Sequence, residues 1–365
     1  MTAMTAWFFK FPHTPSLGGG EFFSLRIAQV LRKGGYAVRL ITSDQRLLRL
    51  FEKHGLPRRR ATLGFEPVSA GYLLLWPLTR ALATFKVRRW LRKIKPGDAV
   101  FLHSLTEKLL LTRPAKRRGA NVYWLEYKIP GKWLWRNPLL RRYRQNAKRA
   151  KLITTSKFAC DAFGKIGVAP ENLAVLYPGV EIAPSPYPND FTIGVLSRLD
   201  PEKGTKEFLR LMTPLLENHP AWRLLIAGVG REESAIKQIA AAHPQMHLLG
   251  LVSERREFFA EISVLAYPTG AEETFGLSLL EAQSCGRPVV ASRRGAIPEA
   301  VAAGESGFLI PPADTALWAE ALEKLSGRET FPAMSDAALK QAEQFSVVNF
   351  EQGLRNLMVT FKTDK

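Results

Sequence analysis

The sequence predicts an α/β protein made of two Rossmann-like domains, and three observations support this fold class. Short apolar runs alternate with segments of helical periodicity in both halves of the chain. A proline-rich stretch over residues 177–190 separates the two halves. The length of 365 residues also suits two domains better than one.

The N-terminal half begins with a strand, a loop, a helix and a second strand, which is the start of a parallel sheet. Apolar residues occupy positions 6–11, and a loop rich in Pro and Gly follows. A helix is predicted over 21–33 because apolar side chains recur there at helical spacing, and Gly34 with Gly35 ends it. Further strands are predicted over the apolar runs 36–42, 99–103, 121–125 and 152–155.

The C-terminal half repeats this alternation. We expect an N-terminal domain over 1–180, a second domain over 181–345 and a helix within 346–365, where apolar residues recur at helical spacing. Ligands bind outside the carboxyl ends of the strands in open α/β sheets. We expect the two domains to face each other across a cleft. The active site is therefore predicted to lie between them. The strands predicted for the second domain are 191–196, 223–227, 247–249, 264–267 and 288–291.

Positive charge is concentrated in one half of the chain. Residues 1–185 carry 34 Lys and Arg against 10 Asp and Glu, a net charge of +24. Residues 186–365 carry 18 against 23, a net charge of −5. A surface as basic as the first attracts anionic partners such as phosphates, acidic lipids or nucleic acid.

The composition disfavours several other classes of protein. No run of about 18 apolar residues is present, so no spanning helix is expected, and the N-terminus lacks the features of a signal peptide. Cys160 and Cys285 form neither a disulfide framework nor a zinc-binding spacing, which favours a reducing cytoplasm. Because the sequence has no Asp-x-Asp clamp and no His/Cys cluster, we expect no metal and no cofactor.

The richest motif joins the predicted strand 264–267 to a helix that begins near Gly276. Glu273 precedes that helix, and Glu281 lies within it. The first turn of a helix presents free backbone N–H groups and the positive end of the helix dipole, which suit a diphosphate. Gly276 would let such a ligand approach the backbone. One carboxylate could hold ribose hydroxyls and the other hexose hydroxyls.

Three further motifs follow predicted strands. Arg198 and Lys203 come after the strand 191–196, where two cations would neutralise a diphosphate. The other two motifs are glycine turns, at which a ligand can approach the backbone. Their residues are Gly228 and Gly230 in the second domain and Gly18 and Gly19 in the first.

In this order the motifs resemble those of the family-4 retaining glycosyltransferases, which have the GT-B fold. The resemblance covers most of the chain and includes a strand that ends at His103. It implies that Arg198 and Lys203 bind the diphosphate of a donor. The other implied roles are ribose binding by Glu281, binding of the transferred sugar by Glu273, backbone donation by Gly276 and Leu277, and closure over the diphosphate by Gly18 and Gly19.

The resemblance implies a metal-independent enzyme that transfers a sugar from a nucleoside diphosphate sugar, with a UDP-sugar favoured, to a hydroxyl acceptor with retention of configuration. The first domain would bind the acceptor, a cell-envelope glycan or a lipid-linked molecule, and the second would bind the donor. The final helix would pack back on the first domain. Two rival functions stay open. One is a nucleotide-sugar epimerase or hydrolase of the same fold, and the other is a basic nucleic-acid-binding protein, although no nucleic-acid module is recognisable.

The catalytic candidates are His103, Glu126 and Glu273. Many members of the family have a histidine after the strand that here ends at Glu126. This carboxylate could orient the acceptor, act as a base, or be structural. His103 could also be a structural histidine, and the glycine turn of the second domain could be a plain turn.

Residues 72–95 and 132–151 are both basic and rich in aromatic residues. One interpretation is a helix that faces the core and has a solvated basic face. The other, which we favour, is a segment that lies on an anionic membrane with its aromatic side down. The protein would then be cytoplasmic and peripheral on the inner face of the membrane. The tryptophans concerned are Trp76, Trp90, Trp133 and Trp135.

Overall fold

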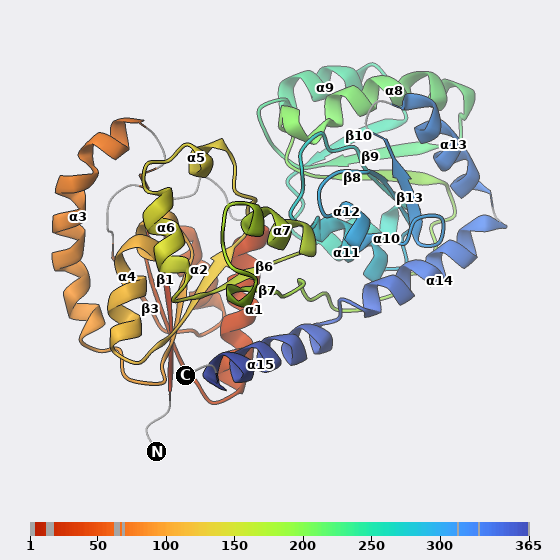
Figure 1. Ribbon diagram of the computed structural model, residues 1–365. Helices are drawn as coiled ribbons and strands as arrows, with labels where there is room; N and C mark the ends of the chain where they lie inside the picture. Colours follow the sequence, from red (N-terminus) through yellow and green to blue (C-terminus); the bar gives the residue numbers. More distant parts are fainter. Residues whose placement is uncertain are drawn as a thin grey trace. The chain divides into compact units, whose positions relative to one another are not determined.

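The computed structural model describes residues 4–11, 18–61, 66–67, 70–311, 314–327 and 329–363. The chain divides into two compact units (Figure 1). The first unit contains Met1–Tyr177 and Glu351–Lys365, and the second contains Pro178–Phe350. Each unit is built on a parallel sheet, so the predicted class of two Rossmann-like α/β folds is confirmed.

The sheet of the first unit has seven strands in the order β3-β2-β1-β4-β5-β6-β7. Every neighbouring pair is parallel, and parallel strands need crossover connections, which the helices supply. All six residues of β5 are buried, as expected for a central strand covered on both faces. The strands are β1 (Thr5–Lys10), β2 (Ala37–Thr42), β3 (Arg58–Arg60), β4 (Ala99–Leu102), β5 (Asn121–Glu126), β6 (Lys151–Thr154) and β7 (Leu173–Val175).

Helices α3, α4, α6 and α7 of the first unit share one apolar core with the strands of this sheet. Trp7, Phe9 and Trp124 from the strands meet Val87 of α3 and Leu109 of α4 in that core. No helix in the described part of the chain is long and apolar enough to cross a membrane. The helices are α1 (Gly19–Lys33), α2 (Gln45–Lys53), α3 (Ala70–Leu91), α4 (Leu105–Arg117), α5 (Lys132–Trp135), α6 (Leu140–Ala147), α7 (Lys157–Lys165) and the short η1 (Pro170–Asn172).

The C-terminal helix, α15 (Val347–Thr363), returns to the first unit, as the resemblance implied. Nζ of Lys33, the last residue of α1, lies 3.4 Å from Oε1 of Glu351. Gly353 lies beside Leu176, because a Cβ built at that glycine would be 3.2 Å from Cδ1 of the leucine.

The sheet of the second unit has six parallel strands in the order β10-β9-β8-β11-β12-β13. Its strands are β8 (Thr192–Leu196), β9 (Arg223–Ala227), β10 (Met246–Gly250), β11 (Val264–Tyr267), β12 (Val289–Ser292) and β13 (Gly307–Ile310). Its helical segments are η2 (Pro201–Lys203), α8 (Thr205–Asn218), α9 (Glu233–Ala241), α10 (Arg255–Glu261), α11 (Leu277–Ser284), α12 (Ile297–Ala300), α13 (Thr315–Ser326) and α14 (Thr330–Glu343).

The structure corrects the prediction for the tryptophans of the basic segments. Trp76 and Trp90 of α3 are each only 6% exposed, and both belong to the core of the first unit. They therefore cannot be the side chains that meet a membrane. Trp133 and Trp135 are exposed, by 38% and 47%. The outward face of α3 instead exposes Leu74, Leu78, Leu82 and Phe85.

Candidate functional site

Three neighbouring strands of the second unit lead into the predicted donor-site motifs. β9, β8 and β11 are adjacent in the sheet and parallel. The segments that follow them are 228–231, 197–204 and 268–276. Because the carboxyl ends of parallel strands meet at one edge of a sheet, the three motifs share that edge, which is where ligands bind in folds of this kind.

Backbone contacts hold the loop after β8 against the loop after β11. The amides of Gly270 and Ala271 both donate to the carbonyl oxygen of Glu202, each at 3.0 Å. Gly204 has a φ of 66°, and a Cβ there would be 2.2 Å from the carbonyl oxygen of Pro268. Only glycine satisfies both the positive φ and the close approach, so this residue allows the two loops to touch.

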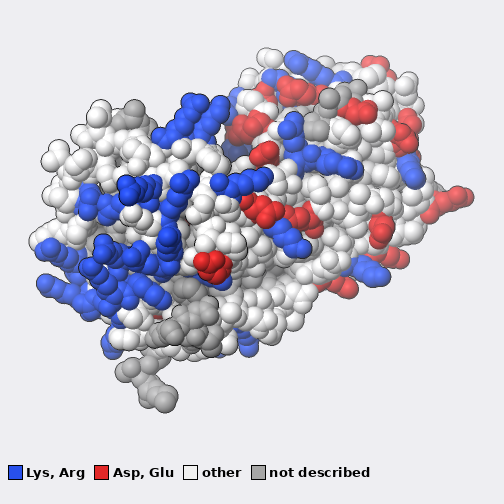
Figure 2. Space-filling view, viewed as in Figure 1, with Lys and Arg blue, Asp and Glu red and all other residues white. Residues whose placement is uncertain are grey.

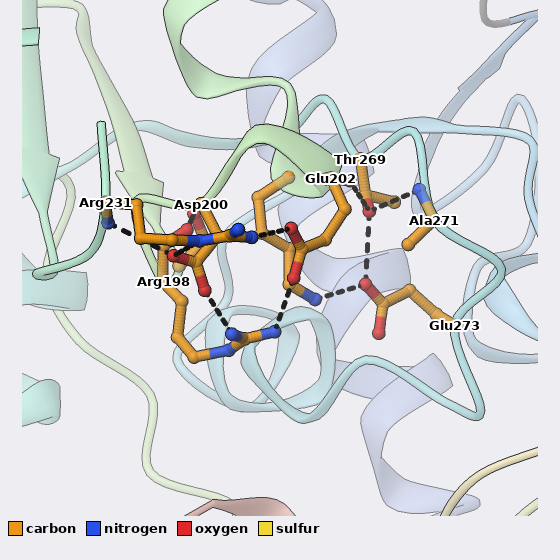
Figure 3. A network of polar contacts seen from close by, with 9 residues as sticks. Arg198, Asp200, Glu202, Arg231, Thr269, Ala271 and Glu273 are labelled. Atoms are coloured by element: carbon orange, nitrogen blue, oxygen red, sulfur yellow. Dashed lines mark hydrogen bonds and ion pairs between the residues drawn. The ribbon is translucent and has the colours of Figure 1, made fainter. Parts of the chain in front are cut away.

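The two loops are also joined by an ion pair between predicted site residues (Figure 3). Nζ of Lys203 lies 2.5 Å from Oε1 of Glu273, and both side chains are only 14% exposed. The Thr269 hydroxyl donates to the same carboxylate oxygen at 3.1 Å. Burial, together with the charge of Glu273, raises the pKa of Tyr267 well above its usual value, so its phenol stays neutral beneath the pair.

Arg198 takes part in a second set of ion pairs at the same edge (Figure 3). Its guanidinium contacts Asp200, and it lies 3.1 Å from Oε1 of Glu202. Arg231 approaches the same two acids from the segment after β9, at 3.3 Å and 3.0 Å. The backbone amide of Arg231 and then its side chain hold the pKa of Asp200 below its ordinary value.

Glu281 lies in α11 and makes a separate ion pair. Its Oε2 is 2.7 Å from the guanidinium of Arg255, the first residue of α10. Burial raises the pKa of the Glu281 carboxyl, and the charge of Arg255 opposes that shift. The structure thus brings Lys203 and Glu273 into direct contact, whereas the contact that it records for the Glu281 carboxylate is with Arg255.

The predicted glycines of this edge have steric reasons to be glycine. A Cβ at Gly228 would be 1.8 Å from the carbonyl oxygen of Ser197, and one at Gly230 would be 2.4 Å from the backbone of Leu199. Gly276 caps α11 with a φ of 88°, so the helix begins at Leu277 as expected. Close packing of the loops explains Gly228 and Gly230 whether or not they also meet a donor.

His103 directly follows β4 in the first unit, and both of its ring nitrogens have hydrogen-bond partners. Nδ1 donates to the carbonyl oxygen of Phe9 at 2.8 Å, and Nε2 lies 2.9 Å from Oγ of Ser24. Burial, followed by the charge of Lys10, lowers the pKa of His103 to about 3, so the ring is neutral near neutral pH. These contacts give His103 a structural role, and its catalytic role stays a prediction.

Glu126 ends β5 with both carboxylate oxygens engaged. Oε2 lies 2.8 Å from Nζ of Lys108 in α4, and Oε1 accepts a hydrogen bond from the Tyr143 hydroxyl at 2.6 Å. The pair is buried, and a buried charge is tolerated only with such partners. Glu126 therefore neutralises Lys108, and its catalytic role also stays a prediction.

Gly18 and Gly19 mark the start of α1. Gly18 is the residue before the helix, and its amide donates to Oε2 of Glu21 at 2.7 Å. The other oxygen of that carboxylate pairs with Lys10. Residues 12–17 of the preceding loop lie outside the described residues.

Several polar residues at the edge of the second sheet were missed as site candidates. Asp200 and Glu202 lie two and four residues after Arg198, so their nearness to that cation in the sequence was a signal that could have identified them. Arg231 carries no such signal, because only the fold brings it to this edge. Arg294 follows β12, and no described residue accepts a hydrogen bond from its buried Nε. Among the described residues no cluster of three or more His, Cys, Asp or Glu could hold a metal ion.

Comparison with known families identifies the class of protein. The model "Glycosyltransferase Family 4" matches residues 17–183, and "Glycosyl transferases group 1" matches residues 190–327. The chain belongs to the family-4, group 1 glycosyltransferases.

Individual relatives place the chain within that family. D-inositol 3-phosphate glycosyltransferase of Corynebacterium jeikeium is 34% identical over 174 residues, which are 42% of this chain and 40% of that protein. The chain thus spans less than half the length of this relative. Anabaena Alr3699/HepE, solved with UDP and glucose, has a TM-score of 0.79 at 21% identity and covers 98% of this chain and 100% of its own. The lipopolysaccharide outer core galactosyltransferase WaaB has a TM-score of 0.74 at 17% identity, with coverages of 98% and 99%. These structural likenesses establish the GT-B fold.

Proposed function

We propose that the chain transfers a glycosyl unit from a nucleoside diphosphate sugar, with a UDP-sugar favoured, to a hydroxyl acceptor. The observation that carries this proposal is the contact of Lys203 with Glu273, beside Arg198, at the carboxyl edge of β8 and β11. The cations suit a diphosphate and the carboxylate suits sugar hydroxyls. UDP and glucose are bound in the solved Anabaena protein of similar fold, which favours the same donor class here.

In this proposal Arg198 and Lys203 hold the donor diphosphate and stabilise the charge that develops as it departs. Both cations already have carboxylate partners, namely Asp200, Glu202 and Glu273. A bound diphosphate would replace some of those contacts with contacts to phosphate oxygens. Donor binding is therefore an exchange of ion pairs, and its free energy is the difference between the two sets.

Glu273 would accept hydrogen bonds from the transferred sugar, and Glu281 from the ribose. Lys203 and Thr269 fix the Glu273 carboxylate, so its orientation is set before any ligand arrives. The backbone amides of Gly276 and Leu277 would donate to the diphosphate at the start of α11, with Gly18 and Gly19 of the first unit also predicted to contact it.

We propose that the acceptor is a cell-envelope glycan or a lipid-linked molecule. The sugar would be transferred to it with retention of the anomeric configuration. The net charge of +24 over residues 1–185 favours an anionic acceptor. WaaB, a lipopolysaccharide outer core galactosyltransferase of similar fold, is consistent with an acceptor of the cell envelope. His103 and Glu126 stay the predicted catalytic residues of the first unit.

The test is a panel of nucleoside diphosphate sugars assayed for nucleotide release, with and without candidate acceptors. Release that depends on acceptor, with a product anomer of the same configuration as the donor, supports the proposal. Turnover with excess EDTA tests the expectation of metal independence. Hydrolysis or epimerisation with donor alone would instead assign a nucleotide-sugar epimerase or hydrolase. Inertness towards every donor, together with a salt-sensitive gel shift, would assign nucleic-acid binding.

A further inference from the structure

The outward face of α3 exposes a row of large apolar side chains. Leu74, Leu78, Leu82 and Phe85 are 83%, 71%, 65% and 73% exposed. They are spaced by four, four and three residues, so they form one stripe along the helix. Trp76, Ala83, Val87 and Trp90 on the opposite face enter the core. Over three turns the helix is therefore apolar on both faces, although the fold needs only one.

Cations gather at the C-terminal end of the same helix. Lys86, Arg88, Arg89, Arg92 and Lys93 are exposed there, and no Asp or Glu occurs between Glu66 and Asp98. Arg89 follows Phe85 by four residues, so the basic end continues the apolar stripe. Figure 2 shows Lys and Arg crowded over the lower left of this view, where that end of α3 lies in Figure 1.

Contacts within the first unit hold these cations close together. The charges of Arg89, Arg59 and Lys93 lie 4.7, 5.4 and 5.7 Å from the ring centroid of Trp90. Cations from β3, from α3 and from the residues just after α3 thus lie around the buried Trp90 ring. An anionic partner would relieve the repulsion among them.

We propose that α3 is a docking helix that inserts its leucine stripe into the interfacial region of an anionic lipid bilayer. Burial of the stripe accounts for the exposed leucines, and acidic headgroups account for the basic end. A second copy of the chain would cover the leucines but would bring another helix without carboxylates. A nucleic acid would pair with the cations but would leave the leucines in water. The bilayer is the partner that satisfies both parts of the surface.

The experiment is co-sedimentation of the full chain with vesicles of phosphatidylcholine, alone or with increasing phosphatidylglycerol. Leu78→Gln/Leu82→Gln removes half of the stripe. Val348→Gln/Val359→Gln is the control, because those side chains of α15 are 74% and 63% exposed. A second pair compares Arg88→Gln/Arg92→Gln with Arg210→Gln/Lys237→Gln, whose positions are exposed in the second unit. Circular dichroism checks that every variant is folded, and Leu74→Gln replaces the leucine pair if that variant is not.

We expect the wild type to bind phosphatidylglycerol vesicles, less at high salt. The leucine variant should lose about a hundredfold or more in lipid affinity, since burying one leucine side chain is worth about tenfold or more and the variant removes two. The arginine variant should lose affinity mainly at low salt, and both controls should bind like wild type. Unchanged binding by the leucine variant would overturn the proposal, as would no binding to acidic vesicles at low salt. A dimer in light scattering that the leucine variant abolishes would assign the stripe to a second copy instead. Vesicle binding needs no donor, so its failure leaves the proposed glycosyl transfer untouched.

Discussion

Lys203 and Glu273 form a largely buried ion pair, 2.5 Å apart, that joins the loop after β8 to the loop after β11. The cation expected to meet a donor diphosphate thus already has a carboxylate partner. Arg198 also has carboxylate partners already, because its guanidinium forms ion pairs with Asp200 and Glu202. Removing a carboxylate and removing a cation should therefore have opposite effects on diphosphate affinity.

We expect Glu202→Gln to bind UDP more tightly than wild type. The substitution frees part of Arg198 for phosphate, and an exposed ion pair is worth up to about 1 kcal/mol, so the gain should be roughly two- to fivefold. Isothermal titration calorimetry with UDP measures it, and the exposed Glu207→Gln in α8 is the control. Weaker UDP binding by Glu202→Gln would show that Arg198 needs Glu202 to be positioned.

Lys203→Ala and Glu281→Ala should each reduce turnover while the fold survives. The proposed contacts are with the diphosphate and the ribose, and the loss of one such charged contact in a closed site costs roughly 2–4 kcal/mol. Nucleotide release with the preferred donor gives the rate, and circular dichroism reports folding. Near-wild-type turnover in either folded variant contradicts the assignment of that residue to the donor site.

Glu126→Gln should destabilise the first unit by roughly 3–5 kcal/mol, because it leaves Lys108 as a buried charge without its partner. Glu126→Gln/Lys108→Met should recover most of that stability in urea unfolding, since both charges are gone. Turnover of the double variant then distinguishes the structural role of Glu126, as the partner of Lys108, from its predicted catalytic role. A rate that stays low supports action on the acceptor, whereas a rate that returns with stability leaves Glu126 structural. If the double variant is no more stable than the single one, the ion pair is not what Glu126 contributes.

His103 should make the protein less stable as the pH falls. The pKa of His103 is about 3 in the folded protein and near 6.5 in the unfolded chain. Between these two values the unfolded chain binds a proton at His103, whereas the folded protein does not. The stabilisation is present above about pH 6.5 and is lost towards pH 3, at up to about 1.4 kcal/mol per pH unit. Urea unfolding of His103→Gln should show a smaller loss between about pH 7 and about pH 5 than wild type. His247→Gln, at an exposed position, should behave like wild type. An equal loss in His103→Gln and wild type would mean that His103 does not take part.

Glu107 should give the opposite slope. Burial, with the charge of Glu66 second, raises its pKa from 4.5 to about 8. The stabilisation is present below about pH 4.5 and is lost as the pH rises towards 8, because the unfolded carboxyl releases its proton first. Glu107→Gln should therefore flatten the decline in the free energy of unfolding between about pH 5 and about pH 8. A decline as steep as that of wild type would contradict a protonated Glu107 in the fold.

Much of the fold could be predicted from the sequence, because buried parallel strands read as apolar runs. The expected strands 223–227 and 264–267 coincide with β9 and β11, and the other predicted strands are within two residues of those observed. β3 was missed because Arg58–Arg60 is a row of three exposed arginines with no apolar signal. β7 and β13 were missed because they are edge strands of three and four residues.

The candidate site could be predicted in its residues but not in its pairings. The motif positions placed Lys203 and Glu273 each after a predicted strand. The structure makes those strands neighbours and brings the two side chains into contact. The approach of Arg231 to Asp200 depends on how β9 pairs with β8, which no local pattern records. The burial of Trp90 was missed for a different reason. With apolar residues on both faces of α3, helical periodicity does not show which face meets the core.

Backbone hydrogen bonds fix the loops at the edge of the second sheet. Close packing also leaves no room for a side chain at Gly204, Gly228 and Gly230. The charged groups that they carry, such as Lys203 and Glu273, add ion pairs to this backbone framework. Substitutions of those groups can therefore alter which ligand is preferred without moving the loops. A chain built in this way can diversify its substrate at low structural cost, and its specificity should be open to redesign one side chain at a time.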